Sequence, residues 1–309
     1  MNIFISGSLA YDRIMDFPGR FVDHILPDKI HVLNVCFNIN GLVEKFGGTA
    51  GNIAYSLAIL GESPFIVATC GEDFARYKKW LAQNSLPLSH IRPIPGVLTA
   101  GAYITTDLDD NQITAFNPGA MAFEAELPAL DASSMVFIGP GNKTDMMNLA
   151  REARLARAPF FFDPGQSLNI WNGDELREAV SGALCFISND YELSQFLRMT
   201  GWQTSDLHNA VEMVITTRGS EGAVMDNGSE KFLIPAVPAG KVLDPTGAGD
   251  TFRAGVLKAR ARNLPWEVAC RMGATAASFS VEHYGTQEHK FSWDEFCRRY
   301  ERVFGPFEG

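Results

Sequence analysis

Short apolar runs alternate with amphipathic stretches from residue 64 to the end of the chain. The apolar runs predict parallel strands buried on both faces, over residues 65–69, 135–139, 159–163, 184–188 and 211–216. The amphipathic stretches predict helices over residues 73–84, 144–157, 174–182, 190–200, 250–263, 265–283 and 292–303. Strands and helices that alternate in this way form a doubly wound, mostly parallel α/β sheet flanked by helices.

Two regions with strand signals interrupt this alternation. Residues 31–40 combine β-branched and aromatic residues, which favours strands outside the main sheet. Residues 101–116 predict a β-hairpin with an acidic turn, in which we expect Asp107, Asp109 and Asp110 to be solvated. We therefore expect one small β-sheet lid over a pocket, formed by residues 13–46 and 99–117, and an α/β body formed by residues 1–12, 47–98 and 118–309.

The composition narrows the classes of function. A net charge of −10 and a pI near 5.1 argue against a nucleic-acid-binding protein. No apolar run reaches membrane-spanning length, and the N-terminus lacks the basic region of a signal peptide. Five widely spaced cysteines, mostly among apolar residues, are typical of a reduced cytoplasmic protein. The six histidines form no i,i+4 pair, which argues against a zinc site.

The stretch DPTGAGDTFRAG, residues 244–255, predicts a glycine turn followed by a helix. A helix that begins here directs its free N–H groups and the positive end of its dipole at one point, so the turn predicts a site for an anion, above all for phosphate. Asp250 lies at the mouth of this site, where its carboxylate would repel a phosphate. Its presence there is explained if it accepts a proton from the group that attacks the phosphate. The alternative is that Asp250 is an ordinary acid of a first helical turn, favoured by the helix dipole.

Polar residues also follow three of the expected strands, in segments 163–166, 189–192 and 217–222. In a parallel sheet these segments lie along one edge, beside the glycine turn, so they predict a single cleft. Asn189 and Glu192 have a spacing that suits either the organisation of a magnesium ion or a helix cap. Arg218 is a candidate phosphate contact or, equally, an exposed turn residue.

A second glycine-rich turn, Phe46-Gly-Gly-Thr-Ala-Gly-Asn52, opens a helix that Gly61 ends. Small residues at Ala50, Gly51 and Ala54 permit a close approach, either by a packed helix or by a ligand, which we favour. Asp12 follows the first strand, residues 2–8, at the place where ligands of open α/β sheets bind.

These strings resemble the signatures of one family. Asp-x-Thr-Gly-Ala-Gly-Asp-Thr-Phe, from Asp244, resembles the C-terminal signature of the ribokinase-like (PfkB) family of sugar and nucleoside kinases. Gly48 and Asn52 match its N-terminal signature, and the segment 217–222, Thr-x-Gly-x-x-Gly, matches its nucleotide strand-turn. The resemblance implies a ribokinase-like fold with a small β-sheet lid and the cofactors ATP and Mg²⁺, and it leaves open a monovalent cation such as K⁺.

The resemblance also implies roles for individual residues. The catalytic base would be Asp250, and the transferring phosphoryl group would be stabilised by the backbone amides of Gly247, Ala248 and Gly249. The phosphoryl acceptor would contact Ser8, Asp12, Gly48, Asn52, Phe116 and Gln166. The nucleotide would contact Asn189, Thr217, Gly219, Gly222, Thr246 and Gln287. Glu192 would act on the magnesium ion through water.

Further segments resemble the bacterial adenosine kinases of this family through nearly the whole chain. They include Phe17-Pro-Gly-Arg-Phe21, Phe116-x-Pro-Gly-Ala-Met121, Asn189-Asp-Tyr-Glu192, Thr200-Gly-Trp202 and Gly285-Thr-Gln287. They imply phosphorylation of the 5′-hydroxyl of a nucleoside, adenosine above all, with Phe116 stacked on the purine. Ala102 departs from this pattern, because it stands where a second aromatic residue is expected. A homodimer through the lid is a further expectation.

Three alternatives remain. A PfkB-type sugar kinase acting on ribose, fructose or a phosphosugar would have the same core. A non-enzymatic nucleoside sensor fits less well, because Asp250 and both glycines of the turn are retained. A dehydrogenase fits least, because no Gly-x-Gly-x-x-Gly follows the first strand.

Overall fold

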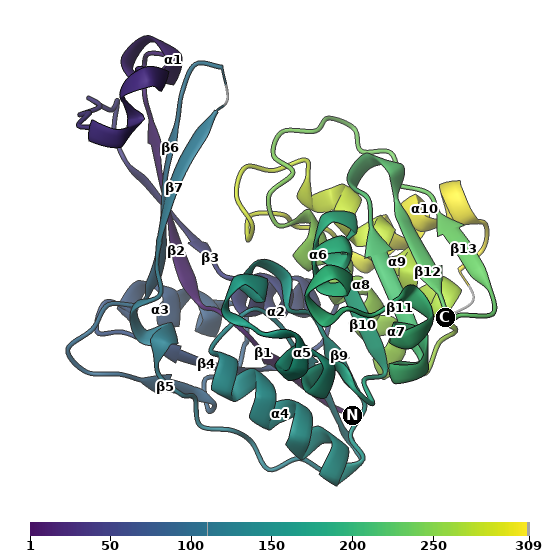
Figure 1. The fold of residues 1–309 in the computed structure, drawn as a ribbon. Coiled ribbons are helices and arrows are strands. Elements are labelled where there is room, and N and C mark those ends of the chain that lie inside the picture. The colour runs from purple at the N-terminus through teal and green to yellow at the C-terminus, as the bar shows by residue number, and fades with distance from the viewer. Residues whose placement is uncertain (110, 308–309) are drawn as a thin grey trace.

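The computed structural model describes residues 1–109 and 111–307, and a nine-stranded sheet forms its centre (Figure 1). In spatial order the strands are β13 (Lys231–Ile234), β12 (Ala223–Asp226), β11 (Met213–Thr217), β10 (Cys185–Asn189), β9 (Phe160–Phe162), β8 (Ser134–Ile138), β1 (Asn2–Ser6), β4 (Phe65–Cys70) and β5 (Ile91–Pro93). The strands from β11 to β5 pair in parallel, and β12 and β13 add an antiparallel edge.

Helices cover both faces of this sheet. The side chains of Ile3 and Ile5 in β1 belong to one buried cluster, whereas that of Phe4 between them belongs to another, since side chains alternate along a strand. The first cluster includes side chains from α2 (Thr49–Ile59), α3 (Ala75–Gln83), α8 (Ala248–Ala261), α9 (Trp266–Ser280) and α10 (Trp293–Phe304). The second includes side chains from α4 (Lys143–Ala156), α5 (Gly173–Val180), α6 (Asp190–Thr200) and α7 (Thr204–Ala210). The predicted doubly wound fold is confirmed.

The expected helices and strands of the body are present, together with four elements that the pattern of apolar and polar residues does not predict. All seven predicted helices begin and end within three residues of their expected positions. The additional elements are β5, β12, β13 and α7. Strands β12 and β13 have only four residues each, and α7 buries a single apolar side chain, Leu207, so none of them produces a periodic signal.

A second, four-stranded sheet projects from the body (Figure 1). Its order is β3 (Val43–Gly47), β2 (Ala10–Asp16), β6 (Ala100–Thr106) and β7 (Gln112–Asn117). We call this sheet, with the loops at its tip, the lid. Strand β2 begins at Ala10, so Asp12 lies on a lid strand rather than in a loop after β1.

The expectation of strands over residues 31–40 is wrong. Residues Pro27–Val32 form a short 3-10 helix, η1, and residues 33–42 form no strand. Phe37 explains the apolar content of the segment, because its ring packs on Phe17 and Phe21, with centroids 4.7 and 5.1 Å away. Phe21 begins the short helix α1 (Phe21–His24). Aromatic residues here build a small cluster at the lid tip instead of a strand.

Asp107 also corrects the expectation of a solvated acidic turn. Its side chain is buried and accepts hydrogen bonds from the backbone N–H groups of Phe21 at 2.8 Å, Asn111 at 2.9 Å and Asp109 at 3.0 Å. These donors hold its pKa below the ordinary range against the opposing effect of burial. Asp107 therefore closes the hairpin turn and attaches α1 to it. Asp109 is exposed beside Arg20, and Asp110 lies outside the described residues.

The remaining short elements are the 3-10 helices η2 (Gly119–Ala122), η3 (Gly165–Ile170) and η4 (Gly219–Glu221). All five cysteines are free thiols, and Cys70, Cys185 and Cys270 are buried. Among the described residues, we find no helix with the length and apolar character needed to cross a bilayer.

Candidate active site

A cavity of about 660 Å³ lies at the carboxyl ends of β9, β10 and β11, beside the first turn of α8. All three polar strand ends contribute to its wall, as the sequence predicts for a parallel sheet. Of the expected site residues, the cavity is lined by Gln166, Asn189, Glu192, Thr217, Gly219, Gly222, Gly247, Ala248, Gly249 and Asp250.

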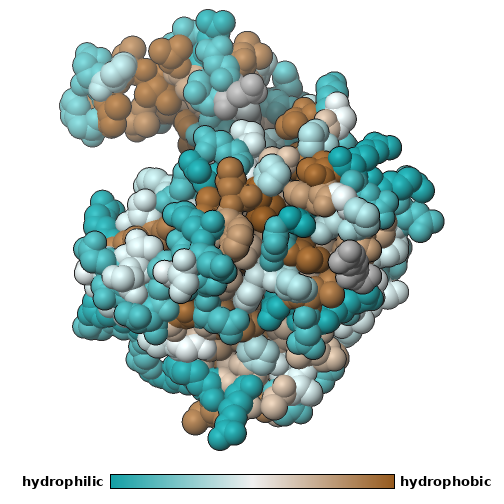
Figure 2. All heavy atoms as spheres, turned by 90° about the vertical axis from the view of Figure 1, so that its right-hand side faces the viewer, coloured by the Kyte–Doolittle hydropathy of each residue, from teal (hydrophilic) through white to brown (hydrophobic). Residues whose placement is uncertain are grey.

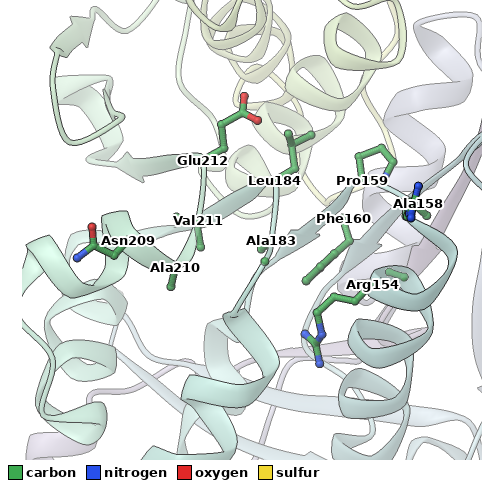
Figure 3. A pocket seen from close by; sticks show the side chains of 13 residues that line it. Arg154, Ala158, Pro159, Phe160, Ala183, Leu184, Asn209, Ala210, Val211 and Glu212 are labelled. Atoms are coloured by element: carbon green, nitrogen blue, oxygen red, sulfur yellow. The ribbon is translucent and has the colours of Figure 1, made fainter.

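A second cavity, of about 500 Å³, lies at the opposite ends of the same strands (Figure 3). Phe160 begins β9, and Leu184 and Val211 just precede β10 and β11. The charged head of Arg154 donates to the backbone oxygens of Glu178 and Ser181, so it is already engaged. None of the expected site residues lines this cavity, so the cavity at the carboxyl edge is the candidate active site.

The glycine turn forms the start of α8 as predicted. Gly247 is the N-cap, with φ +77°, and Asp250 lies in the first helical turn. The Ala248 N–H donates to Pro245 O at 3.2 Å across the turn. Gly247 and Gly249 are therefore the better candidate amide donors to an anion, supported by the positive end of the helix dipole.

Asp250 is half-buried and has two stabilising neighbours. Its Oδ2 accepts a hydrogen bond from Asn52 Nδ2 at 2.8 Å, so the two family signatures meet at one carboxylate. Burial raises the pKa of Asp250 above its ordinary value, while the charge of Arg253 and the hydrogen bond from Asn52 lower it. A carboxylate with a raised pKa beside an anion-binding turn has the properties of a general base.

Arg253 forms a buried ion pair that the sequence analysis did not identify. Its Nε donates to Asp163 Oδ2 at 2.5 Å, and both side chains are more than nine-tenths buried. Its guanidinium lies directly beneath the glycine turn, since a Cβ on Gly249 would be 2.7 Å from Nη1. Burial raises the pKa of Asp163 to about 6, against the opposing effect of Arg253. An arginine one helical turn after Asp250, on a buried helix, is the signal that could have revealed this pair.

Several of the residues expected to contact the phosphoryl acceptor lie where the lid joins the body. Asp12 lies on β2, and burial, with the charges of Asp250 and Asp244, raises its pKa to about 6. Gly48, with φ +87°, is the N-cap of α2. Ser8 Oγ accepts from the N–H of Thr49 at 3.0 Å and so supports the start of the same helix. The carboxylates of Asp12 and Asp250 are therefore close enough for the charge of Asp250 to act on Asp12.

Phe116 lies on the edge strand β7 of the lid and is 50% exposed. It pairs directly with Ala102 on β6, and Ala102 pairs with Asp12 on β2. Residues paired across neighbouring strands point to the same face, so the carboxylate and the ring share one face of the lid with only a methyl group between them. The departure at Ala102 thus leaves a gap between two potential ligand contacts.

The segment 189–192 forms the helix cap, which is one of the two interpretations left open by the sequence. Asn189 and Glu192 form a capping box at the start of α6, with Glu192 Oε2 accepting from the Asn189 N–H at 2.9 Å. Both residues also line the cavity. The cap and a role toward a bound ion are therefore compatible. Arg218, by contrast, is exposed and pairs with Glu221 at 2.7 Å.

Gln287 and Thr246 do not line the cavity. Thr246 is exposed, and its N–H donates to Asp244 Oδ1 at 2.9 Å. Gln287 is buried, and its amide bonds to Asn52, Tyr77 and Trp80. The structure corrects the expectation of a nucleotide contact for Gln287, because its polar atoms are directed at side chains around Asn52.

Gly51 is closely approached by side chains rather than by the expected ligand. A Cβ at this position would collide with the hydroxyl of Tyr77 and lie 3.0 Å from Gln287 Nε2. The glycine of the turn that precedes Asn52 is therefore explained by internal packing. Asn52 itself faces Asp250 and Gln287.

The comparisons with known proteins agree with this geometry. The nucleoside kinase of Methanocaldococcus jannaschii is 32% identical to the chain over 278 residues, which cover 89% of this chain and 92% of that protein. The structure of a Burkholderia thailandensis nucleoside kinase in complex with inosine is 36% identical, with a TM-score of 0.85 over 98% of both chains. An adenosine kinase from Sinorhizobium meliloti, at 20% identity and a TM-score of 0.71 over 93% of this chain and 95% of that one, shares the fold alone.

A model of the pfkB family of carbohydrate kinases matches residues 19–293. This match contains both glycine-rich turns, the lid strands β3, β6 and β7, and all three polar strand ends. The chain therefore belongs to the PfkB family of carbohydrate kinases.

Proposed function

We propose that this kinase transfers the γ-phosphoryl group of ATP to the 5′-hydroxyl of a nucleoside, with adenosine as the substrate. Membership of the family makes the chain a phosphotransferase with an alcohol group as acceptor. The observation that carries the proposal is the position of Asp250 beside Gly247 and Gly249, at a cavity for the nucleotide and within electrostatic reach of Asp12. Such a carboxylate is suited to take the proton of a hydroxyl that attacks a phosphoryl group.

The residues divide the reaction among them. Asp250 accepts the proton of the 5′-hydroxyl, and Asn52 holds one of its oxygens in place. The amides of Gly247 and Gly249 stabilise the charge that develops on the transferring group, with the positive charge of Arg253 beneath them. Asp12 accepts hydrogen bonds from the ribose hydroxyls, and the closed lid keeps water from ATP.

The acidic side chains of the cavity fit a bound Mg²⁺. Glu192 uses Oε2 in its capping box, and Asp163 has a buried Oδ1 without a hydrogen-bond partner. Both residues line the cavity. Mg²⁺ keeps most of its waters and takes phosphate oxygens, so one or two carboxylates suffice. Glu192, with Asp163, would hold the ion through water, and the ion would neutralise charge on the phosphates. Asn189, Thr217, Gly219 and Gly222 would contact the nucleotide that it accompanies, and Gln166, on the wall of the same cavity, would contact the nucleoside.

Two observations favour a purine nucleoside over a free sugar. Phe116 exposes a flat ring on the same face of the lid as Asp12, and stacking on such a ring suits a planar base better than a sugar alone. The related Burkholderia thailandensis kinase is described in complex with inosine, which has a purine base. A sugar kinase, the second candidate, would draw on Asp12 and leave Phe116 without a partner.

A substrate panel tests the proposal. Phosphorylation of adenosine, inosine, cytidine, ribose, fructose and fructose phosphates by ATP is measured with Mg²⁺, in buffers with and without K⁺. We expect the highest kcat/KM with adenosine and no turnover without Mg²⁺. A higher kcat/KM with a sugar than with any nucleoside would overturn the nucleoside assignment, and binding of adenosine without consumption of ATP would indicate a sensor.

We further propose that a second copy of the chain covers the tip of the lid. Apolar side chains gather there, as Figure 2 shows at the top of the molecule, and they include Val22, Leu26, Ile30, Val32, Leu33 and Leu108. A contiguous apolar surface of this kind marks an interaction site.

The free thiols suit a reducing compartment, and we propose that the protein is cytoplasmic.

The oligomeric state provides the test of this dimer. Light scattering coupled to size exclusion should give a dimer for the native protein and a monomer for Leu26→Asp. Leu155→Asp is the matched control, because Leu155 is 79% exposed on α4, in the body of the protein. A native monomer would contradict the proposal.

A further inference from the structure

A line of four side chains connects Trp80, on α3, to the carboxylate of Asp250. Trp80 Nε1 donates to Gln287 Oε1 at 2.9 Å, and Gln287 Nε2 donates to Asn52 Oδ1 at 3.0 Å. Asn52 Nδ2 then donates to Asp250 Oδ2 at 2.8 Å. Asn52 and Gln287 are buried, so water does not compete freely for these bonds.

The direction of every bond in this line follows from its first member. An indole N–H can only donate, so the amide oxygen of Gln287 must face Trp80 and its NH₂ group must face Asn52. The oxygen of the Asn52 amide is then directed at Gln287, and its NH₂ group is directed at Asp250. Trp80 thereby determines that the carboxylate meets a donor and not another oxygen.

The surrounding side chains hold this line rigidly. The indole of Trp80 is stacked between Phe46 and Tyr55, with ring centroids 5.5 and 5.8 Å away and interplanar angles of 20°. The second N–H of the Gln287 amide is taken by Tyr77, at 2.6 Å. The Tyr77 hydroxyl then donates to Gly47 O at 2.8 Å, at the end of lid strand β3. All polar atoms of the Gln287 amide are therefore used.

We propose that Gln287 is a positioning residue that orients the Asn52 amide, so that Asn52 donates to Asp250 and leaves the other carboxylate oxygen to the substrate hydroxyl. This inference rests on the proposed function only for its effect on turnover. Without the Gln287 amide, the Asn52 side chain loses its anchor and can rotate away from the carboxylate, which weakens the hydrogen bond to the ionised base.

The first test is the titration of Asp250 in the free protein, which requires no substrate. The ¹³C signal of its carboxyl group is assigned with Asp250→Asn and followed against pH by NMR. Gln287→Met preserves the length of the side chain and removes its hydrogen bonds. We expect it to raise the pKa of Asp250 by about 0.5 to 1 unit, since one hydrogen bond to the charged form is lost. An unchanged titration would overturn the proposal.

The upstream end of the line supplies a second variant. Trp80→Phe keeps an aromatic ring, although a smaller one, between Phe46 and Tyr55 and removes the indole N–H that donates to Gln287. We expect a smaller rise in the pKa of Asp250, because Gln287 can then take either orientation. A fall in that pKa would contradict a relay that begins at Trp80.

Tyr55→Phe is the matched control. Tyr55 donates a buried hydrogen bond to His289 O at 2.8 Å, so the variant loosens the segment that carries Gln287 without touching the line to Asp250. Its thermal midpoint should fall about as much as that of Gln287→Met, while Asp250 titrates as in the native protein. Equal shifts in Asp250 titration for the two variants would indicate a general loosening, and the proposal would fail.

Kinetics show whether Gln287 acts through Asn52. With the best acceptor from the substrate panel, Gln287→Met should lower kcat by roughly 10- to 100-fold and leave the KM for ATP within about threefold. In an Asn52→Leu background the same change should have no further effect on kcat. Multiplying losses would overturn the relay. If no acceptor is found, the titrations still decide the inference while the proposed function fails.

Discussion

Asn52 Nδ2 lies 2.8 Å from Asp250 Oδ2, although the two residues are 198 positions apart in the chain. Each belongs to a glycine-rich turn that begins a helix, and α2 and α8 carry them to the same place. The contact explains why a carboxylate is tolerated beside an anion-binding turn. One oxygen of Asp250 accepts a hydrogen bond from Asn52, and the other remains available as a base.

Asp250→Asn preserves size and removes the basic oxygen. We expect kcat to fall by roughly 10²- to 10⁴-fold with little change in KM, which is the usual contribution of a general base. In a loose phosphoryl-transfer transition state the proton leaves late, so part of this loss reflects orientation of the hydroxyl. The variant should unfold at the same temperature as the native protein or higher, because a half-buried charge is removed. A kcat near the native value would refute the assignment of Asp250 as the base.

The pH dependence should have an acidic limb near pH 6. Both Asp12, with a pKa of about 6, and Asp250, with a raised pKa, must be ionised to accept hydrogen bonds or protons. The value of kcat/KM therefore falls as the pH decreases through 6. The charge of Asp250 raises the pKa of Asp12, and repulsion between two charges acts on both, so Asp12→Asn should move the remaining limb to lower pH.

The free energy of unfolding should depend on the ionisation of Asp12 in the direction opposite to activity, which requires the ionised form. A carboxyl group whose pKa is raised on folding stabilises the folded state while it is protonated, and this contribution is lost as the pH rises from about 4 to 6. Urea titrations should therefore show Asp12→Asn to be more stable than the native protein at pH 8 and about equal at pH 4. The same difference at both pH values would exclude the ionisation of Asp12 as its cause.

Much of this site is predictable, for physical reasons. Residues 163, 189 and 217 lie at the carboxyl ends of parallel strands, and these ends must meet at one edge of the sheet. The contacts of Gln287 are not predictable, because Trp80 lies 207 positions away in the chain and only the complete fold brings the two side chains together. Asp107 has the sequence surroundings of a solvated turn, and its burial depends on α1, where Phe21 lies 86 positions earlier in the chain. Local patterns report strands and turns, whereas buried polar partners depend on the whole fold.

Lid closure should be visible by hydrogen exchange. Strands β2, β3, β6 and β7 project from the body, and the exposed ring of Phe116 is available for a substrate to contact (Figure 1). Adenosine should protect residues 13–45 and 99–117 more than it protects the nine-stranded sheet. Uniform protection of the whole chain would contradict closure of the lid.

Phe116→Ala tests the assignment of the base site. Loss of a stacked ring should raise the KM for adenosine by roughly 5- to 10-fold and affect ribose little. Ile113→Ala is the matched control, because Ile113 is also exposed on β7 but, three residues away, points to the other face. If adenosine and ribose respond alike, or if the control has the same effect, Phe116 serves the lid structure and not the base.

The Arg253–Asp163 pair should link stability to pH through a second route. Arg253→Met keeps the aliphatic stem and leaves the Asp163 carboxylate buried without its cation, which should lower the free energy of unfolding by about 3 to 5 kcal/mol at pH 8. The pKa of Asp163, already about 6 beside the arginine, rises further in the variant, so at pH 5 the group is protonated and most of the stability returns.

The double variant Arg253→Met/Asp163→Leu should be stable at both pH values, since no charge remains to be paired. It should still lose turnover, because the positive charge beneath Gly249 is absent. An equal loss of stability by Arg253→Met at pH 5 and pH 8 would mean that Arg253 contributes through packing alone.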